Sequence, residues 1–103
     1  MILHLVTFRW KEGVSPKDVA HLCEELAAFR QKVDCLVAYH FGPDLRLRKG
    51  NADFGIAALV GSPEALAEYL EHPAHHELVS QVLGPMSASR EAAQIEVAQI
   101  AAA

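Results

Sequence analysis

The segment Ile2–Lys11 constrains the fold most strongly, because its side chains alternate between two faces and both faces are mostly apolar. A period of two predicts a β-strand. A strand of an antiparallel sheet usually keeps one face in water. We therefore expect both faces of this strand to be covered. One face carries Ile2, His4, Val6, Phe8 and Trp10, and the other carries Leu3, Leu5, Thr7 and Arg9.

A helix is expected at Pro16–Lys32. Ser15 suits the N-cap, Pro16 suits the first helical position, and Asp18 lies in the first turn, where the helix dipole favours a carboxylate. Apolar residues then recur at helical spacing and predict one buried face. They are Val19, Leu22, Cys23, Leu26, Phe29 and Val33.

The rest of the chain predicts two strands, two short helices and a last strand. Strands at Leu36–Phe41 and Asp53–Gly61 would flank a polar connection over residues 43–52. Ser62 and Pro63 repeat the helix-start signal, and Pro73 breaks the helical pattern that follows. The remaining elements would be helices at Pro63–Glu71 and onward to about Met86, and a strand at Ala93–Ile100.

The order β-α-β-β-α-β predicts one α+β domain over residues 1–103, with a ferredoxin-like, four-stranded antiparallel sheet. Helices would cover one sheet face and leave the other exposed in a monomer. A large exposed apolar face usually marks an interface. Because 51% of the residues are hydrophobic, we expect a homodimer that buries sheet against sheet.

Composition argues against several classes of protein. The net charge of −4, without a basic patch, argues against a nucleic-acid partner. Apolar runs are too short to span a membrane, and the first residues lack the features of a signal peptide. Cys23 and Cys35 form no CxxC pair, so reduced thiols are expected. We expect a cytoplasmic protein.

Three of the six histidines form the segment His72-Pro73-Ala74-His75-His76. Spacings of three or four residues on one helix can place two imidazoles on a metal. Pro73 interrupts the helix, however, and no carboxylate or Cys completes a ligand set. We therefore predict no metal and no organic cofactor.

His75 continues an apolar stripe, and Tyr69 lies on the inward side of the preceding helix. An imidazole and a phenol that face an apolar cavity can act as an acid–base pair. The alternative is a buried, hydrogen-bonded pair that has only a structural role. His4 can likewise be interpreted as a functional group or as a hydrogen-bonded core residue. We predict one cavity lined by all three and closed mainly by Val6, Phe8, Leu66, Leu70 and Val79.

Two segments resemble the stress-responsive A/B barrel (Dabb) family. Residues 2–11, ILHLVTFRWK, are similar to its opening strand, in which an apolar-His-apolar-Val pattern runs into Phe-Arg or Phe-Lys. Residues 69–75, YLEHPAH, are similar to its Tyr-x-x-His-Pro-x-His segment. Gly42-Pro43 after the second strand agrees as well, and the resemblance covers about residues 1–100.

This resemblance implies a ferredoxin-like subunit that dimerises through its sheet into an α+β barrel, with a pocket between sheet and helices in each subunit. A plant polyketide cyclase of the family works without a cofactor, through a His and a Tyr. These correspond to His75 and Tyr69, and its first-strand pocket histidine corresponds to His4. A further pocket histidine on strand three falls on Gly55, so it is absent.

Three functions follow as hypotheses. The first is a cofactor-independent lyase or cyclase that acts on an aromatic or polyketide-like carbonyl compound, with His75 and Tyr69 as catalytic residues and His4 binding substrate. The second is a non-catalytic stress-response dimer, or one that binds a small apolar or aromatic ligand. The third is a cofactor-free monooxygenase, since related barrels host that chemistry. Fold alone does not choose among them.

Overall fold

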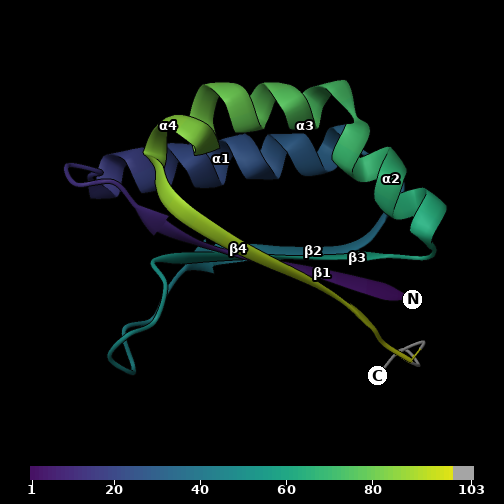
Figure 1. Cartoon of the computed structure of the whole chain (residues 1–103). Helices are drawn as coiled ribbons and strands as arrows, with labels where there is room; N and C mark the ends of the chain where they lie inside the picture. The colour runs from purple at the N-terminus through teal and green to yellow at the C-terminus, as the bar shows by residue number, and fades with distance from the viewer. Residues whose placement is uncertain (99–103) are drawn as a thin grey trace.

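The computed structural model describes residues 1–98, which form one antiparallel sheet with helices on one of its faces (Figure 1). The sheet has the order β2-β3-β1-β4, so the predicted ferredoxin-like arrangement is confirmed. The elements are β1 (Ile2–Trp10), α1 (Pro16–Lys32), β2 (Leu36–Pro43), β3 (Phe54–Val60), α2 (Pro63–Glu71), α3 (Pro73–Leu78), the π-helical turn η1 (Val79–Leu83), α4 (Gly84–Met86) and β4 (Ser87–Glu96).

β1 lies inside the sheet, where it pairs with β3 on one side and β4 on the other. Its alternation places His4, Val6 and Phe8 under the helices, and all three are buried. Leu3 and Leu5 lie on the opposite face, which we call the outer face. The expected strand is therefore confirmed, with the helices covering one of its two faces.

α1 begins and ends at the predicted residues. Asp18 N donates to Ser15 Oγ at 3.2 Å, and Ser15 N donates to Asp18 Oδ2 at 2.9 Å, which is a complete capping box. Leu22, Leu26 and Phe29 are buried against the sheet. This helix supplies one wall of the core and anchors Phe29 beside the tyrosines described below.

Pro73 ends α2 and starts α3, as the sequence predicts. His72 is the cap between them, because Ala74 N donates to His72 Nδ1 at 3.0 Å. After α3 the helix continues as the wider π-helical turn η1, in which the Gly84 N–H donates to the Val79 carbonyl five residues earlier. Single π-turns of this kind are common near functional sites.

The last strand begins earlier than predicted. β4 runs from Ser87 to Glu96, whereas Ala93–Ile100 was expected, and residues 99–100 of that range lie outside the described residues. The start was missed because β4 is an edge strand with exposed small and charged residues from Ala88 to Ala92. Its backbone pairing with β1 defines it, and no apolar alternation marks it.

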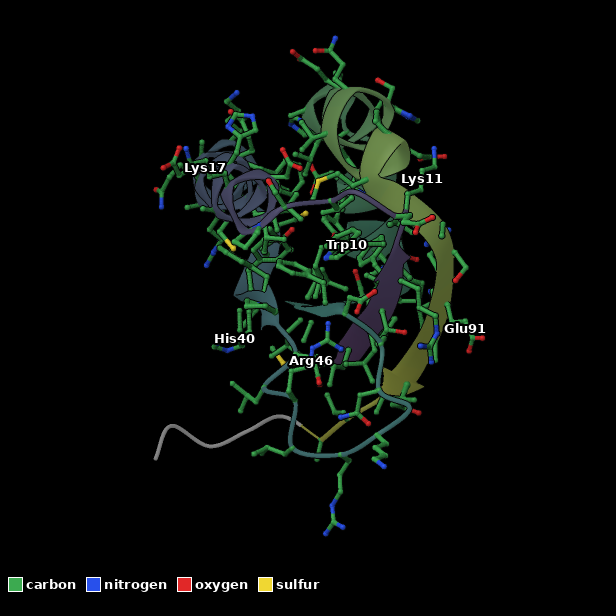
Figure 2. All side chains as sticks on the ribbon, turned by 90° about the vertical axis from the view of Figure 1, so that its left-hand side faces the viewer. Trp10, Lys11, Lys17, His40, Arg46 and Glu91 are labelled. Atoms are coloured by element: carbon green, nitrogen blue, oxygen red, sulfur yellow. The ribbon has the colours of Figure 1, made fainter. Side chains whose placement is uncertain are left out.

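The loop over residues 44–53 extends below the sheet, on the side away from the helices (Figure 1). Arg46 Nη2 lies 2.6 Å from Asp53 Oδ1, and Arg9 Nη2 donates to the Gly50 carbonyl at 2.8 Å. Figure 2 shows His40 and Arg46 on this same side, with Trp10 between sheet and helices. The ordered loop keeps Leu45 and Leu47 about three-quarters exposed, at 77% and 76%.

Replacement of Gly84 by Ala is expected to destabilise the fold. An added Cβ would lie 2.8 Å from the Val79 carbonyl oxygen, so the π-turn would have to shift. We expect the free energy of unfolding in urea to fall by about 1–3 kcal/mol. Gly61→Ala is the matched control, because nothing lies within 4 Å of its added Cβ. A Gly84→Ala protein as stable as wild type would contradict this account of the turn.

Candidate functional site

A pocket of about 180 Å³ lies between β1 and the helical segments from α2 to α4. Its lining is mainly apolar and includes four imidazole or phenol groups from four different elements. The lining residues are His4, Val6, Phe8, Tyr39, Ile56, Tyr69, Leu70, His75, Leu78, Val79, Leu83, Gly84, Ser87 and Arg90.

His4, Tyr69 and His75 converge in this pocket. The Tyr69 and His75 ring centroids are 5.2 Å apart, and those of His4 and Tyr69 are 5.9 Å apart, both in edge-to-face geometry. His4 is 3% exposed and Tyr69 is 2% exposed. The break at Pro73 produces this convergence, because it turns the chain between the helix of Tyr69 and that of His75.

His4 is held as a neutral ring with a defined tautomer. Gln94 Nε2 lies 2.9 Å from His4 Nδ1. An amide nitrogen only donates, so Nδ1 accepts and the ring proton resides on Nε2. Burial lowers the pKa of His4, and the positive charge of Arg90 lowers it further. His4 is therefore a neutral hydrogen-bond donor at pH 7.

His75 and Tyr69 have complementary protonation states. Burial lowers the pKa of His75, and charge on His76, His4 and Arg90 acts in the same direction. Burial raises the pKa of Tyr69 to about 12. At neutral pH the site thus holds an unprotonated imidazole that can accept a proton, next to a phenol that keeps its own.

The predicted lining is recovered with one exception. Val6, Phe8, Leu70 and Val79 line the pocket together with His4, Tyr69 and His75. Leu66 does not, and its inclusion was wrong. It lies one turn before Leu70 on α2 and packs against the hydrophobic core instead.

Several lining residues were not identified from the sequence. Tyr39 and Ile56 follow the inward alternation of β2 and β3, and that signal could have located them. Ser87 and Arg90 were missed because the last strand was expected to begin at Ala93. Tyr39 adjoins Tyr69, with ring centroids 6.3 Å apart, and burial raises its pKa well above the usual range.

Gly55 does not occupy a pocket position. It pairs with Thr7 and Gly42 and lies on the outer face. The neighbouring β3 residue, Ile56, is buried in the pocket lining. The resemblance places the pocket histidine of the plant cyclase at Gly55, whereas side chains at Gly55 would point away from this pocket.

The other histidines lie outside this pocket. His72 caps α3, and His21 is exposed 3.8 Å from Glu25. His40 and His76 are exposed. Within residues 1–98 no group of three or more His, Cys, Asp or Glu side chains is arranged to hold a metal ion.

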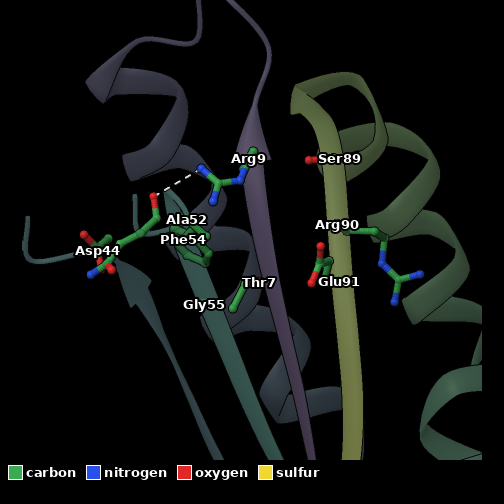
Figure 3. Close-up of a pocket in the computed structure, with 10 residues that line it drawn as sticks. Thr7, Arg9, Asp44, Ala52, Phe54, Gly55, Ser89, Arg90 and Glu91 are labelled. Carbon is green, nitrogen blue, oxygen red and sulfur yellow. Dashed lines mark hydrogen bonds between the residues drawn. The ribbon is translucent and has the colours of Figure 1, made fainter. Parts of the chain in front are cut away.

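A second depression, of about 380 Å³, lies on the outer face (Figure 3). Its polar lining includes Asp44 and Asn51 of the 44–53 loop, together with strand residues. The strand residues are Thr7, Arg9, Ser89, Arg90 and Glu91. Arg9 is already engaged there, since its Nη1 and Nη2 donate to the carbonyls of Asn51 and Gly50. Its described lining contains carboxylates and guanidinium groups but no imidazole or phenol.

The fold and this pocket define a ferredoxin-like α+β protein with a largely apolar pocket between sheet and helices. The chain belongs to the stress-responsive A/B barrel domain (Dabb) family, whose sequence model matches residues 2–97. Among the described residues, no helix has both the length and the apolar character needed to cross a membrane.

Relatives of known name or structure support this assignment. The chain is 29% identical over 87 residues to the stress-response A/B barrel domain-containing protein HS1 of Arabidopsis thaliana, covering 82% of this chain and 80% of HS1. A dimeric ferredoxin-like protein of unknown function from Thermobifida fusca is 32% identical with a TM-score of 0.87, covering 93% of this chain and 90% of that one. The hydroxynitrile lyase of Passiflora edulis shares the fold, with a TM-score of 0.81, 13% identity, and coverage of 98% and 96%.

The pocket histidines are expected to remain neutral down to mildly acidic pH. Their folded pKa values lie below the ordinary 6.5, so the unfolded chain binds protons more readily than the folded chain. The contribution of these two rings to the free energy of unfolding is therefore fully present above pH 6.5, and it declines as the pH falls below that value. NMR titration of the ring protons measures the pKa values of His4 and His75, and the variants His4→Gln and His75→Gln assign the signals. A pKa above 6.5 for either ring would contradict the burial argument.

Proposed function

We propose that this protein is a cofactor-independent lyase or cyclase that acts on an aromatic or polyketide-like carbonyl compound. The observation that carries the proposal is the convergence of His4, Tyr69 and His75 in one mainly apolar pocket of about 180 Å³. His75 is the general base and Tyr69 its acidic partner. His4, Val6, Phe8, Leu70 and Val79 bind the substrate.

Each group has a defined task. Neutral His75 accepts a proton from the carbon next to the substrate carbonyl, and the electron pair left behind moves onto the carbonyl oxygen. Tyr69 is protonated at neutral pH, so its hydroxyl donates a hydrogen bond to the developing enolate oxygen. His4 Nε2 is a second donor that orients the substrate. The apolar lining excludes water and strengthens these contacts.

Similar proteins support a reaction of this class. The Passiflora edulis protein of the same fold is a hydroxynitrile lyase, so this architecture can carry lyase chemistry. The name of HS1 refers to a stress response and states no reaction. A non-catalytic ligand-binding or stress-response dimer is therefore the alternative that the assay below distinguishes.

Exchange of α-hydrogens tests the base directly. Acetophenone in D₂O is expected to exchange its methyl hydrogens for deuterium when the protein is present, as followed by NMR. His75→Ala should lower the rate by roughly 10²–10⁴, the usual contribution of a general base. Tyr69→Phe should have a smaller effect, because it removes one hydrogen bond and retains the ring.

His21→Ala is the matched control, since that histidine is exposed on α1. Circular dichroism establishes that each variant is folded. Exchange that proceeds equally in His75→Ala and His21→Ala would refute the catalytic assignment. Absence of exchange in wild type would favour the ligand-binding alternative.

We further propose that a second copy of this chain covers the outer face. That face carries Leu3, Leu5, Leu59 and Ile95 within the sheet. The 44–53 loop, which carries the exposed Leu45 and Leu47, extends on the same side (Figure 1). The similar proteins from Thermobifida fusca and Bacteroides fragilis are described as dimeric. Burial of such a face stabilises association by the hydrophobic effect.

Ile95→Asp is expected to shift the protein from dimer toward monomer at micromolar concentration, measured by light scattering after size-exclusion chromatography. A charge opposite Leu3 would have to be desolvated in the interface. Val79→Asp is the matched control, because Val79 is 40% exposed and Ile95 45%, yet Val79 lies on the helix side. Wild-type protein that elutes as a monomer would rule out this assembly.

A further inference from the structure

Arg90 lies at the edge of the pocket that holds His4, Tyr69 and His75. It is on β4 opposite Phe8, and paired residues on neighbouring strands share a face. Figure 3 shows the Arg90 side chain leaving β4 toward the helices, away from the side of Glu91 and Thr7. Arg90 lines this pocket beside the α3–α4 segment and also borders the outer-face depression, because β4 is the edge strand between them. The guanidinium is therefore a pocket group, although the residue itself is exposed.

The Arg90 guanidinium is available for a ligand. In the described part of the chain, the salt-bridge contacts are Arg46 with Asp53 and the longer approach of His21 to Glu25, and neither involves Arg90. The arginine side chains that donate hydrogen bonds there are those of Arg9 and Arg46. Among the residues that the structure describes, the five donor N–H groups of this planar guanidinium thus have no protein acceptor.

The pocket has a positive local charge in a chain whose net charge is −4. Its described lining contains Arg90 and no acidic side chain. The charge reaches the pocket interior, since Arg90 contributes to the lowered pKa of both His4 and His75. An anionic group on a ligand would be attracted to this end of the pocket, away from the neutral rings.

We propose that Arg90 binds a carboxylate of the ligand, so that the substrate is an aromatic or polyketide-like carbonyl compound that also carries a carboxylate. This inference rests on the proposed function and specifies its substrate class. A planar guanidinium binds a carboxylate through two parallel hydrogen bonds. Because Arg90 is exposed, the carboxylate stays in contact with water and escapes most of the desolvation cost of a buried ion.

The size of the pocket agrees with this arrangement. A cavity of about 150 Å³ lined by apolar side chains can hold one benzene molecule. The 180 Å³ found here thus accommodates a single ring. With the ring among Val6, Phe8 and Leu83, the charged substituent lies at the opening beside Arg90.

Binding of the carboxylate would also affect the base. The Arg90 charge disfavours protonation of His75 in the free protein. A bound carboxylate offsets that charge, so His75 becomes more basic when the substrate is present. Arg90 would then couple substrate recognition to the strength of the base.

Benzoate and benzamide test the proposal, because they have nearly the same size and differ in charge. Dissociation constants are measured for both from changes in the His4 and His75 ring signals in NMR. Wild type is expected to prefer benzoate by about fivefold, the scale of an exposed ion pair. Arg90→Gln should abolish the preference while leaving benzamide affinity unchanged, and Arg90→Lys should retain part of it.

Arg48→Gln is the matched control, since it removes one positive charge from the exposed 44–53 loop. It should keep the wild-type preference. Equal affinity of wild type for the two probes, or a preference that survives Arg90→Gln, would overturn the role of Arg90 and leave the proposed function standing. If neither benzoate nor benzamide binds, both the role of Arg90 and the proposed function are overturned, because the pocket then holds no single-ring ligand.

Discussion

The structure depends on a central strand that must be covered on both faces. β1 pairs with β3 and β4, and its inward residues His4, Val6 and Phe8 are buried under the helices. Hydrophobic burial of that face forms the core and also buries the imidazole of His4 within it. Because side chains alternate along a strand, the residues between them form the outer face. One strand thus contributes both to the pocket and to the proposed dimer surface.

The break at Pro73 is the second requirement of the site. A continuous helix would carry Tyr69 and His75 along one axis, six residues apart. Because His72 caps a new helix there, the two side chains come to a ring-centroid separation of 5.2 Å. The π-turn that follows adds Val79, Leu83 and Gly84 to the pocket wall. Backbone irregularity and functional groups coincide in this part of the chain, as they often do.

The low polarity of the pocket favours the uncharged form of each ionisable group inside it. Burial keeps His4 and His75 neutral and Tyr69 protonated, which are the states that proton transfer from carbon requires. Arg90, at the opening, is in contact with water. A ligand with an apolar ring and one anionic group would satisfy both environments.

Local signals in the sequence determined most of the fold. Ser15, Pro16 and Asp18 predicted the start of α1, and Pro63 and Pro73 predicted the divided helical region. Alternation along β1 placed His4 on the face of Val6 and Phe8. Tertiary structure alone decided the start of β4, because an exposed edge strand is defined by backbone hydrogen bonds to its neighbour and carries no apolar pattern. The β4–β1 pairing placed Arg90 at the pocket, and the pairing of β3 with β1 and β2 placed Gly55 away from it. Packing directed Leu66 into the core. These positions depend on contacts between residues far apart in the chain.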